Sequence, residues 1–127
     1  MVIDKRSKIF VAGHGGMVGS AVLRNLIRLG YNNILTKNRD ELELMDQMEV
    51  SRFYKENQPE YVFICSAKVG GIYANNTYRA QFIYENLQIQ NNLIHGSYVN
   101  KIKKLIFLGS SCIYPKNSKQ PIKEDYL

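Results

Sequence analysis

Short apolar runs alternate along this chain with longer amphipathic stretches. Runs with the length and composition of buried strands occupy residues 9–12, 33–37, 61–65 and 104–108. A further pair, Leu42 and Leu44, alternates with charged residues, which favours a short edge strand. The spacing of apolar positions predicts helices over residues 17–29, 46–57 and 78–100. The last helix has an apolar side formed by Ile83, Leu87, Ile94 and Tyr98.

This order of strands and helices is typical of an α/β fold with a doubly wound parallel sheet. Right-handed crossovers between parallel strands lead to the Rossmann-like strand order 3-2-1-4-5. The first and fourth strands are then neighbours, and the ligand crevice lies at their carboxyl ends. We expect residues 1–127 to form a single domain of this kind, because the length suits one compact core.

A glycine cluster follows the first predicted strand directly. Gly13, Gly16 and Gly19 are spaced three apart, and Gly15 is an additional glycine. In a dinucleotide-binding unit the first glycine allows a tight turn, the second admits the diphosphate, and the third brings the helix close to the sheet. The amino end of the helix adds partial positive charge and free N–H donors. His14 lies inside this loop, where contact with the cofactor is favoured over catalysis.

Two later segments carry polar side chains that suit chemistry beside this loop. Arg39 follows the second strand, about twenty residues after Gly19, where a basic residue suits the 2′-phosphate of NADP. Lys37 is a second candidate, although Arg39 can hold phosphate with two donors. Ser110 follows the last strand, where a hydroxyl can polarise a carbonyl group. Cys112 is either a proton carrier or an inert packing residue.

Composition narrows the partners that we expect. The net charge is +6, and six lysines lie within residues 101–123, which favours a solvated face or an anionic nucleotide over nucleic acid. No apolar run is long enough to span a membrane, and no residues have the spacing of metal ligands. The first residues contain no apolar signal region and the cysteines are few, so we expect a cytoplasmic protein.

Four segments of the chain resemble the GDP-L-fucose synthase family, a branch of the extended short-chain dehydrogenases/reductases. They are residues 12–21, 39–42, 67–78 and 107–116. The glycine pattern is widespread, whereas the two later segments are much more specific. The resemblance implies that NADPH and a GDP-sugar bind, and that relatives act as homodimers. The family inverts carbons 3 and 5 of GDP-4-keto-6-deoxy-D-mannose and reduces its 4-keto group.

The resemblance also assigns roles to individual residues. It implies that Ser110 holds the keto oxygen and that Cys112 moves protons during epimerisation. The residues that it implies for NADP binding are Gly13, His14, Gly15, Gly16, Met17, Val18, Gly19, Arg39, Asp40, Glu41, Leu42, Glu43, Leu44, Ala67, Leu108, Gly109, Ser110 and Ser111.

The chain departs from the family pattern in two respects. Relatives often have arginine at the position of Gly15, so one cationic contact to NADP is missing. None of the nine tyrosines is followed four residues later by lysine, although the family uses a Tyr-x-x-x-Lys pair. We therefore expect an amino-terminal cofactor-binding portion without the sugar-nucleotide domain, inactive by itself. Two alternatives stay open: another extended-family enzyme acting on a sugar nucleotide, or a non-catalytic dinucleotide-binding module.

Overall fold

Four parallel strands form the sheet of the structure, a computed structural model that describes residues 3–127. The strands are β1 (Ile9–Ala12), β2 (Ile34–Leu35), β3 (Tyr61–Ile64) and β4 (Lys104–Phe107). Their order across the sheet is β2-β1-β3-β4, and β1 pairs with β3 along its whole length. The predicted parallel, doubly wound arrangement is therefore confirmed, with the crossover between β1 and β3 that creates a ligand crevice.

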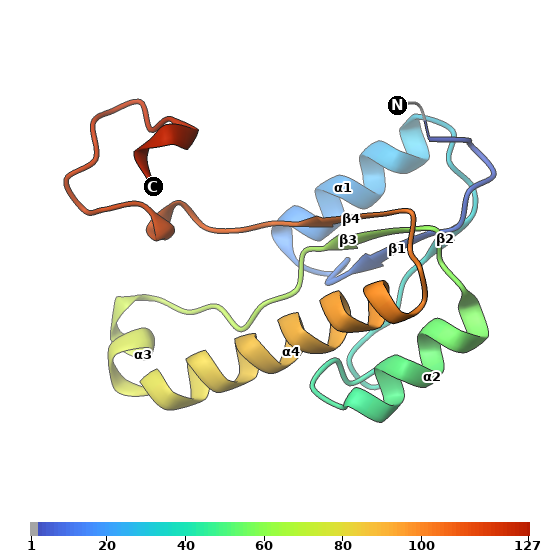
Figure 1. Cartoon of the computed structure of the whole chain (residues 1–127), viewed down its shortest axis with the longest axis horizontal. Coiled ribbons are helices and arrows are strands. Elements are labelled where there is room, and N and C mark those ends of the chain that lie inside the picture. Colours follow the sequence, from blue (N-terminus) through green and yellow to red (C-terminus); the bar gives the residue numbers. More distant parts are fainter. Residues whose placement is uncertain (1–2) are drawn as a thin grey trace.

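Helices cover both faces of this sheet (Figure 1). The helix α1 (Met17–Arg28) packs on one face, and α2 (Gln47–Asn57) and α4 (Arg79–Val99) lie on the other. A short helix, α3 (Ile72–Thr77), precedes α4 and was not predicted. None of the helices among residues 3–127 is both long enough and apolar enough to cross a membrane.

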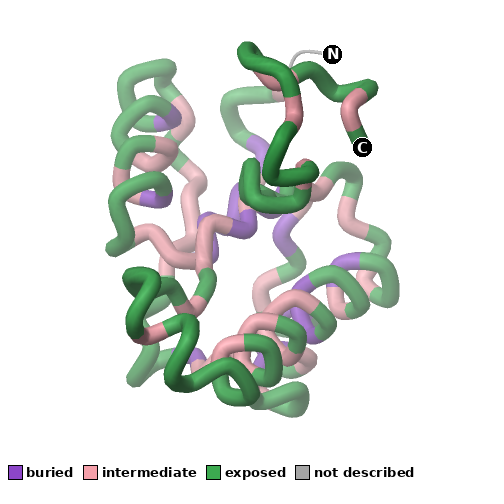
Figure 2. The backbone as a smooth tube through the Cα atoms, turned by 90° about the vertical axis from the view of Figure 1, so that its left-hand side faces the viewer, coloured by how far each residue is buried: buried purple, intermediate pink, exposed green. Residues whose placement is uncertain are grey.

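The core is divided by β1, whose side chains point alternately to the two faces. Ile9 and Val11 pack with Leu26 of α1, whereas Phe10 and Ala12 pack with residues of α2 and α4. All four residues of β1 are fully buried. In Figure 2 the buried part of the backbone is concentrated around the strands and the helix faces turned toward them. The carboxyl end of β1, where the glycine loop begins, is therefore firmly anchored.

The predicted edge strand around Leu42 and Leu44 is not formed. The backbone N–H groups of Glu41 and Leu42 donate to Asn38 O at 3.1 and 3.0 Å, which closes a turn in place of a strand ladder. Leu42 joins the core and is 5% exposed, so its apolar character reflects burial in a turn. The order of the four strands that do form agrees with the prediction once this strand is removed.

Two helix ends are fixed by residues directly beside them. Asp46 caps α2 by accepting from the N–H groups of Met48 and Glu49 at 2.8 and 3.0 Å. Gly30 follows α1 with a φ of 84°, the left-handed conformation that favours glycine.

The side of α4 that packs against the rest of the molecule is not the apolar side predicted from the sequence. Ile83, Leu87, Ile94 and Tyr98 are all exposed. The buried residues of α4 are Asn92, Leu93 and Ser97. The Tyr54 side chain packs against Gly96, where a Cβ would lie 2.7 Å from the ring, so small residues are required on this side. Its hydroxyl lies 3.0 Å from Ser97 Oγ, and burial raises the pKa of Tyr54 to about 12.

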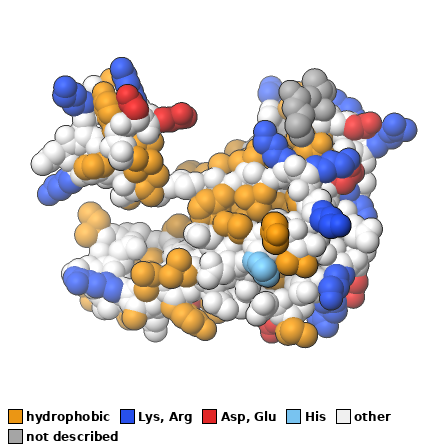
Figure 3. Space-filling view, in the orientation of Figure 1, with side chains coloured by type: hydrophobic (Ala, Val, Ile, Leu, Met, Phe, Trp, Pro, Cys, Tyr) orange, Lys and Arg blue, Asp and Glu red, His pale blue; other side chains and the backbone are white. Residues whose placement is uncertain are grey.

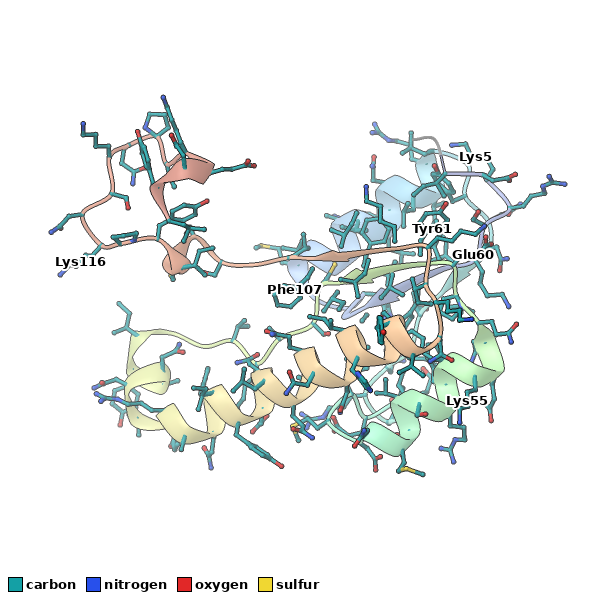
Figure 4. The ribbon with its side chains drawn as sticks, in the orientation of Figure 1. Lys5, Lys55, Glu60, Tyr61, Phe107 and Lys116 are labelled. Atoms are coloured by element: carbon teal, nitrogen blue, oxygen red, sulfur yellow. The ribbon has the colours of Figure 1, made fainter. Side chains whose placement is uncertain are left out.

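The segment after β4 projects from the body of the molecule (Figure 1). It contains two single turns of 3₁₀ helix, Ser111–Ile113 and Glu124–Tyr126, and most of its residues are exposed. Figure 4 shows Phe107 at the carboxyl end of β4, Glu60 and Tyr61 at the opposite end of the sheet, and Lys116 on the projecting segment.

Candidate functional site

The loop between β1 and α1 is shaped by close backbone contacts. Gly13 has a φ of 80°, and a Cβ there would lie 2.7 Å from the backbone of Ser66. A Cβ on Gly19 would lie 2.0 Å from the carbonyl oxygen of Gly13, so only glycine lets α1 approach the turn. A Cβ on Gly15 would meet nothing within 4 Å. The first and third glycines therefore have the roles predicted from their spacing.

The amino end of α1 offers donors to an anion. Gly16 is the N-cap residue and supplies no side-chain acceptor, and the first turn contains no acidic residue. The first hydrogen bond of the helix runs from Ser20 N–H to Gly16 O at 2.9 Å. The N–H groups of Met17, Val18 and Gly19 therefore have no partner within the helix. This end has the donors and the partial positive charge that suit a diphosphate.

A cleft of about 530 Å³ lies at the carboxyl ends of β1 and β3. Of the residues predicted to bind the cofactor, those that line it are Gly13, Gly16, Met17, Val18, Arg39, Leu42, Glu43, Leu44 and Ala67. Those that do not line it are His14, Gly15, Gly19, Asp40, Glu41, Leu108, Gly109, Ser110 and Ser111. The structure thus brings the glycine loop together with Arg39 and Ala67 in one cleft, which the residues directly after β4 do not line.

Two buried polar atoms beside the cleft have no hydrogen-bond partner within residues 3–127. They are His14 Nδ1 and Ser66 Oγ. Buried polar groups are nearly always paired, so unpaired ones indicate a site completed by a ligand or water. Ser66 was missed in the sequence, although its position directly after the buried strand 61–65 could have indicated it. Its neighbour Cys65 also lines the cleft, and burial raises the pKa of that thiol.

Two of the three basic residues that line the cleft, Lys37 and Arg39, each form an ion pair with an acid four residues later. Arg39 Nε donates to Glu43 Oε2 at 2.8 Å, and Lys37 Nζ lies 3.0 Å from Glu41 Oε1. The hydrogen bond to Glu43 raises the pKa of Arg39, which therefore stays charged. Arg39 is the more exposed cation, with 74% of its side chain accessible, so it remains available to a ligand. Asp40 points to solvent and takes no part in either pair.

A second, more open groove of about 790 Å³ contains Ser110 and Cys112. Figure 3 shows a hollow between the projecting segment and α3, while hydrophobic side chains gather over β4. Ser110 caps the 3₁₀ turn, and its Oγ accepts from Cys112 N–H at 3.2 Å. Both residues are exposed. Arg79, Asn75 and other residues of the α3 region form the opposite wall.

The loop after β3 joins the two clefts. Lys68 and Val69 line both of them. Asn86 of α4 fixes this loop, because its side chain accepts from Lys68 N–H at 2.8 Å and donates to Lys68 O at 2.9 Å. The Lys68 ammonium also forms an ion pair with Glu85. These α4 residues were not found from sequence, since their polar side chains carry no recognisable motif. The two clefts are therefore neighbours that share the wall formed by this loop.

The strand, the glycine turn, the helix amino end and the adjacent cleft define a dinucleotide-binding protein of the Rossmann class. The unpaired donors of α1 and the glycines that keep the turn tight fit the diphosphate of such a cofactor. The chain belongs to the NAD dependent epimerase/dehydratase family, which it matches over residues 9–127.

Curated and solved relatives agree with this assignment. The chain is 56% identical to GDP-L-fucose synthase 1 of Arabidopsis thaliana over 98% of its length, and 49% identical to GDP-L-fucose synthase of Escherichia coli over 96%. It covers 38% of each of these proteins. A solved GDP-mannoheptose C4 reductase from Campylobacter jejuni, with NADP bound, is 50% identical with a TM-score of 0.93. That match covers 99% of this chain and 37% of the reductase chain.

Proposed function

We propose that this chain is the NADPH-binding part of an enzyme that epimerises GDP-4-keto-6-deoxy-D-mannose at carbons 3 and 5 and reduces its 4-keto group, giving GDP-L-fucose. The observation that carries the proposal is the juxtaposition of two clefts. One contains the glycine loop and Arg39, the other contains Ser110 and Cys112, and Lys68 and Val69 border both.

The cofactor end of the proposal rests on the first cleft. The N–H groups at the start of α1 bind the diphosphate, and Arg39 binds the 2′-phosphate that distinguishes NADPH from NADH. Ser66, whose hydroxyl is buried and unpaired, donates a further hydrogen bond to the cofactor. The proposal also includes, as cofactor-binding residues, the predicted residues that do not line the cleft, such as His14, Gly15 and Asp40. When bound, NADPH supplies the hydride that reduces the keto carbon.

The substrate end rests on the second groove. Ser110 donates to the keto oxygen, which acidifies the hydrogens on the two flanking carbons. Cys112 lies two residues away and exchanges protons with those carbons. Epimerisation distinguishes this reaction from simple reduction. The heptose reductase that is 50% identical to this chain is named only as a C4 reductase.

The proposal extends to the setting of the protein. Cys65 and Cys112 are both free thiols, which suits a reducing compartment, and we place the protein in the cytoplasm.

The exposed apolar side of α4, which includes Ile83, Leu87 and Tyr98, is a surface suited to the contact of a homodimer. Residues 1–127 act as a single NADP-binding domain, and the sugar-nucleotide domain lies outside them. We propose neither nucleic acid nor membrane as a partner.

The experiment measures binding and turnover in two preparations: residues 1–127, and the product of the complete reading frame. Both should bind NADPH more tightly than NADH by calorimetry. With GDP-4-keto-6-deoxy-D-mannose in D₂O, NMR should show deuterium entering at carbons 3 and 5, and NADPH absorbance should fall. Turnover is expected only where a Tyr-x-x-x-Lys pair is present. Reduction without deuterium at these carbons would identify a reductase, and NADPH binding without turnover in both preparations would identify a binding module.

A further inference from the structure

The ion pair between Arg39 and Glu43 has an arrangement that goes beyond charge neutralisation. Glu43 Oε2 accepts from Arg39 Nε at 2.8 Å, while Oε1 accepts from the backbone N–H of Met45 at 3.1 Å. The backbone N–H of Glu43 donates in turn to Glu49 Oε2 at 2.9 Å. Glu43 is thus tied to the start of α2, and only 33% of its side chain is exposed. The carboxylate that holds Arg39 is itself held in place.

The bond to Glu43 uses only one of the donor groups of Arg39. Within residues 3–127, the two terminal Nη groups of Arg39 make no hydrogen bond, although the side chain lines the cleft. A guanidinium group binds phosphate best through a pair of parallel N–H donors. An acid that binds Nε leaves one such pair, formed by the terminal groups, available. It also removes much of the rotational freedom that a surface arginine would lose on binding phosphate.

The neighbouring pair repeats this arrangement two residues earlier. Glu41 Oε1 contacts Lys37 Nζ at 3.0 Å, and Glu41 Oε2 accepts from Asn38 N–H at 2.9 Å. Each acid therefore uses one oxygen for a backbone donor and the other for a cation four residues before it. The difference is that Glu43 lines the cleft and Glu41 does not. Both cations line the cleft, so the Arg39 pair is the one whose acid is also placed to affect a bound ligand.

We propose that Glu43 is a positioning residue that holds Arg39 by Nε, so that its terminal donors are preorganised for the 2′-phosphate of the cofactor. This inference rests on the proposed function, because it assumes that NADP binds in the cleft. A simple counterion would have the opposite effect on affinity. It would lower the attraction of Arg39 for phosphate, and its removal would strengthen phosphate binding.

The test compares adenosine 2′,5′-bisphosphate with AMP, two probes that differ only in the 2′-phosphate, by calorimetry on the protein. In Glu43→Ala, affinity for the bisphosphate should fall by about tenfold, while affinity for AMP stays within about twofold. Glu43→Gln should lie between the two proteins, because its amide oxygen still accepts from Nε. Glu56→Gln removes one charge from an exposed acid on α2 and should change neither affinity. Arg39→Ala should abolish the preference for the bisphosphate.

The outcomes separate the inference from the proposed function. If Arg39→Ala weakens bisphosphate binding but Glu43→Ala does not, or strengthens it, the positioning role is overturned and NADP binding stands. If the unaltered protein does not prefer the bisphosphate, the assignment of the 2′-phosphate to Arg39 fails, and the role of Glu43 fails with it. Unchanged melting temperatures would show that the variants are folded.

Discussion

The two clefts differ in how completely the described part of the chain encloses them. The cofactor cleft lies at the end of β1, whose residues are all buried, and its walls come from elements on both sides of the sheet. The groove that we propose for the substrate lies beside Ser110 and Cys112, which are exposed on the segment that projects beyond β4. The difference teaches that the first cleft is shaped by the core, whereas the groove that we propose for the substrate depends on the less enclosed segment.

The largest expected effect comes from the exposed groove. In the product of the complete reading frame, replacing Cys112 with alanine should lower deuterium exchange at carbons 3 and 5 by about 10²–10⁴-fold, because a proton-transfer group is lost. NADPH affinity should stay within about twofold, since Cys112 does not line the cofactor cleft. NMR exchange rates and calorimetry on the same preparation measure the two effects. A comparable loss of NADPH affinity would show that the clefts are not separate.

A smaller effect is expected from the glycine loop, and here the chain offers a matched pair. Gly19→Ala places a Cβ 2.0 Å from Gly13 O and must move α1 or the turn. We expect it to lower the free energy of unfolding by about 2–3 kcal/mol and to weaken NADPH binding. Gly15→Ala meets no atom within 4 Å and should leave the free energy of unfolding within about 0.5 kcal/mol. Denaturant unfolding curves measure both, and equal effects would contradict the close-contact argument.

The smallest effect is expected from replacing Ser66 with alanine. Whether this change stabilises or destabilises the protein depends on whether the cofactor is bound. Alanine removes a buried, unpaired hydroxyl, so without cofactor the free energy of unfolding should rise by about 1 kcal/mol. NADPH affinity should fall by about threefold if the hydroxyl bonds the cofactor. Ser20→Ala is the control, because that hydroxyl already donates to Met17 O at 3.1 Å. Thermal unfolding with and without NADPH distinguishes the cases. A destabilised Ser66→Ala protein without cofactor would contradict this assignment.

Local signals in the sequence were sufficient for most of the fold. The run 9–12 with its glycines, the Asp46 cap and Gly30 each impose a backbone geometry that depends little on distant residues. The packed side of α4 was not predictable in this way. That side is chosen by Tyr54 of α2, which requires Gly96 and pairs with Ser97, and such contacts have no periodic apolar signature.

The candidate site was predictable to a similar extent. Gly13 and Arg39 were found because each follows a strand at the same edge of the sheet, whereas Ala67 was found only through the family resemblance. Ser66 and Asn86 were missed, since a buried unpaired hydroxyl and a side-chain clamp on a loop become visible only when the partners are placed in space. Residues 108–111 do not line the first cleft, where we expected them to contact the cofactor. Their role in cofactor binding stays a prediction.

The position of β4 at the end of the strand order has a consequence for handling the protein. Within residues 3–127 no strand pairs with its outer side, and its Phe107 is 44% exposed. An uncovered strand edge with apolar side chains is a template on which a strand of another molecule can add. Wherever this edge stays uncovered, we expect the protein to self-associate as its concentration rises.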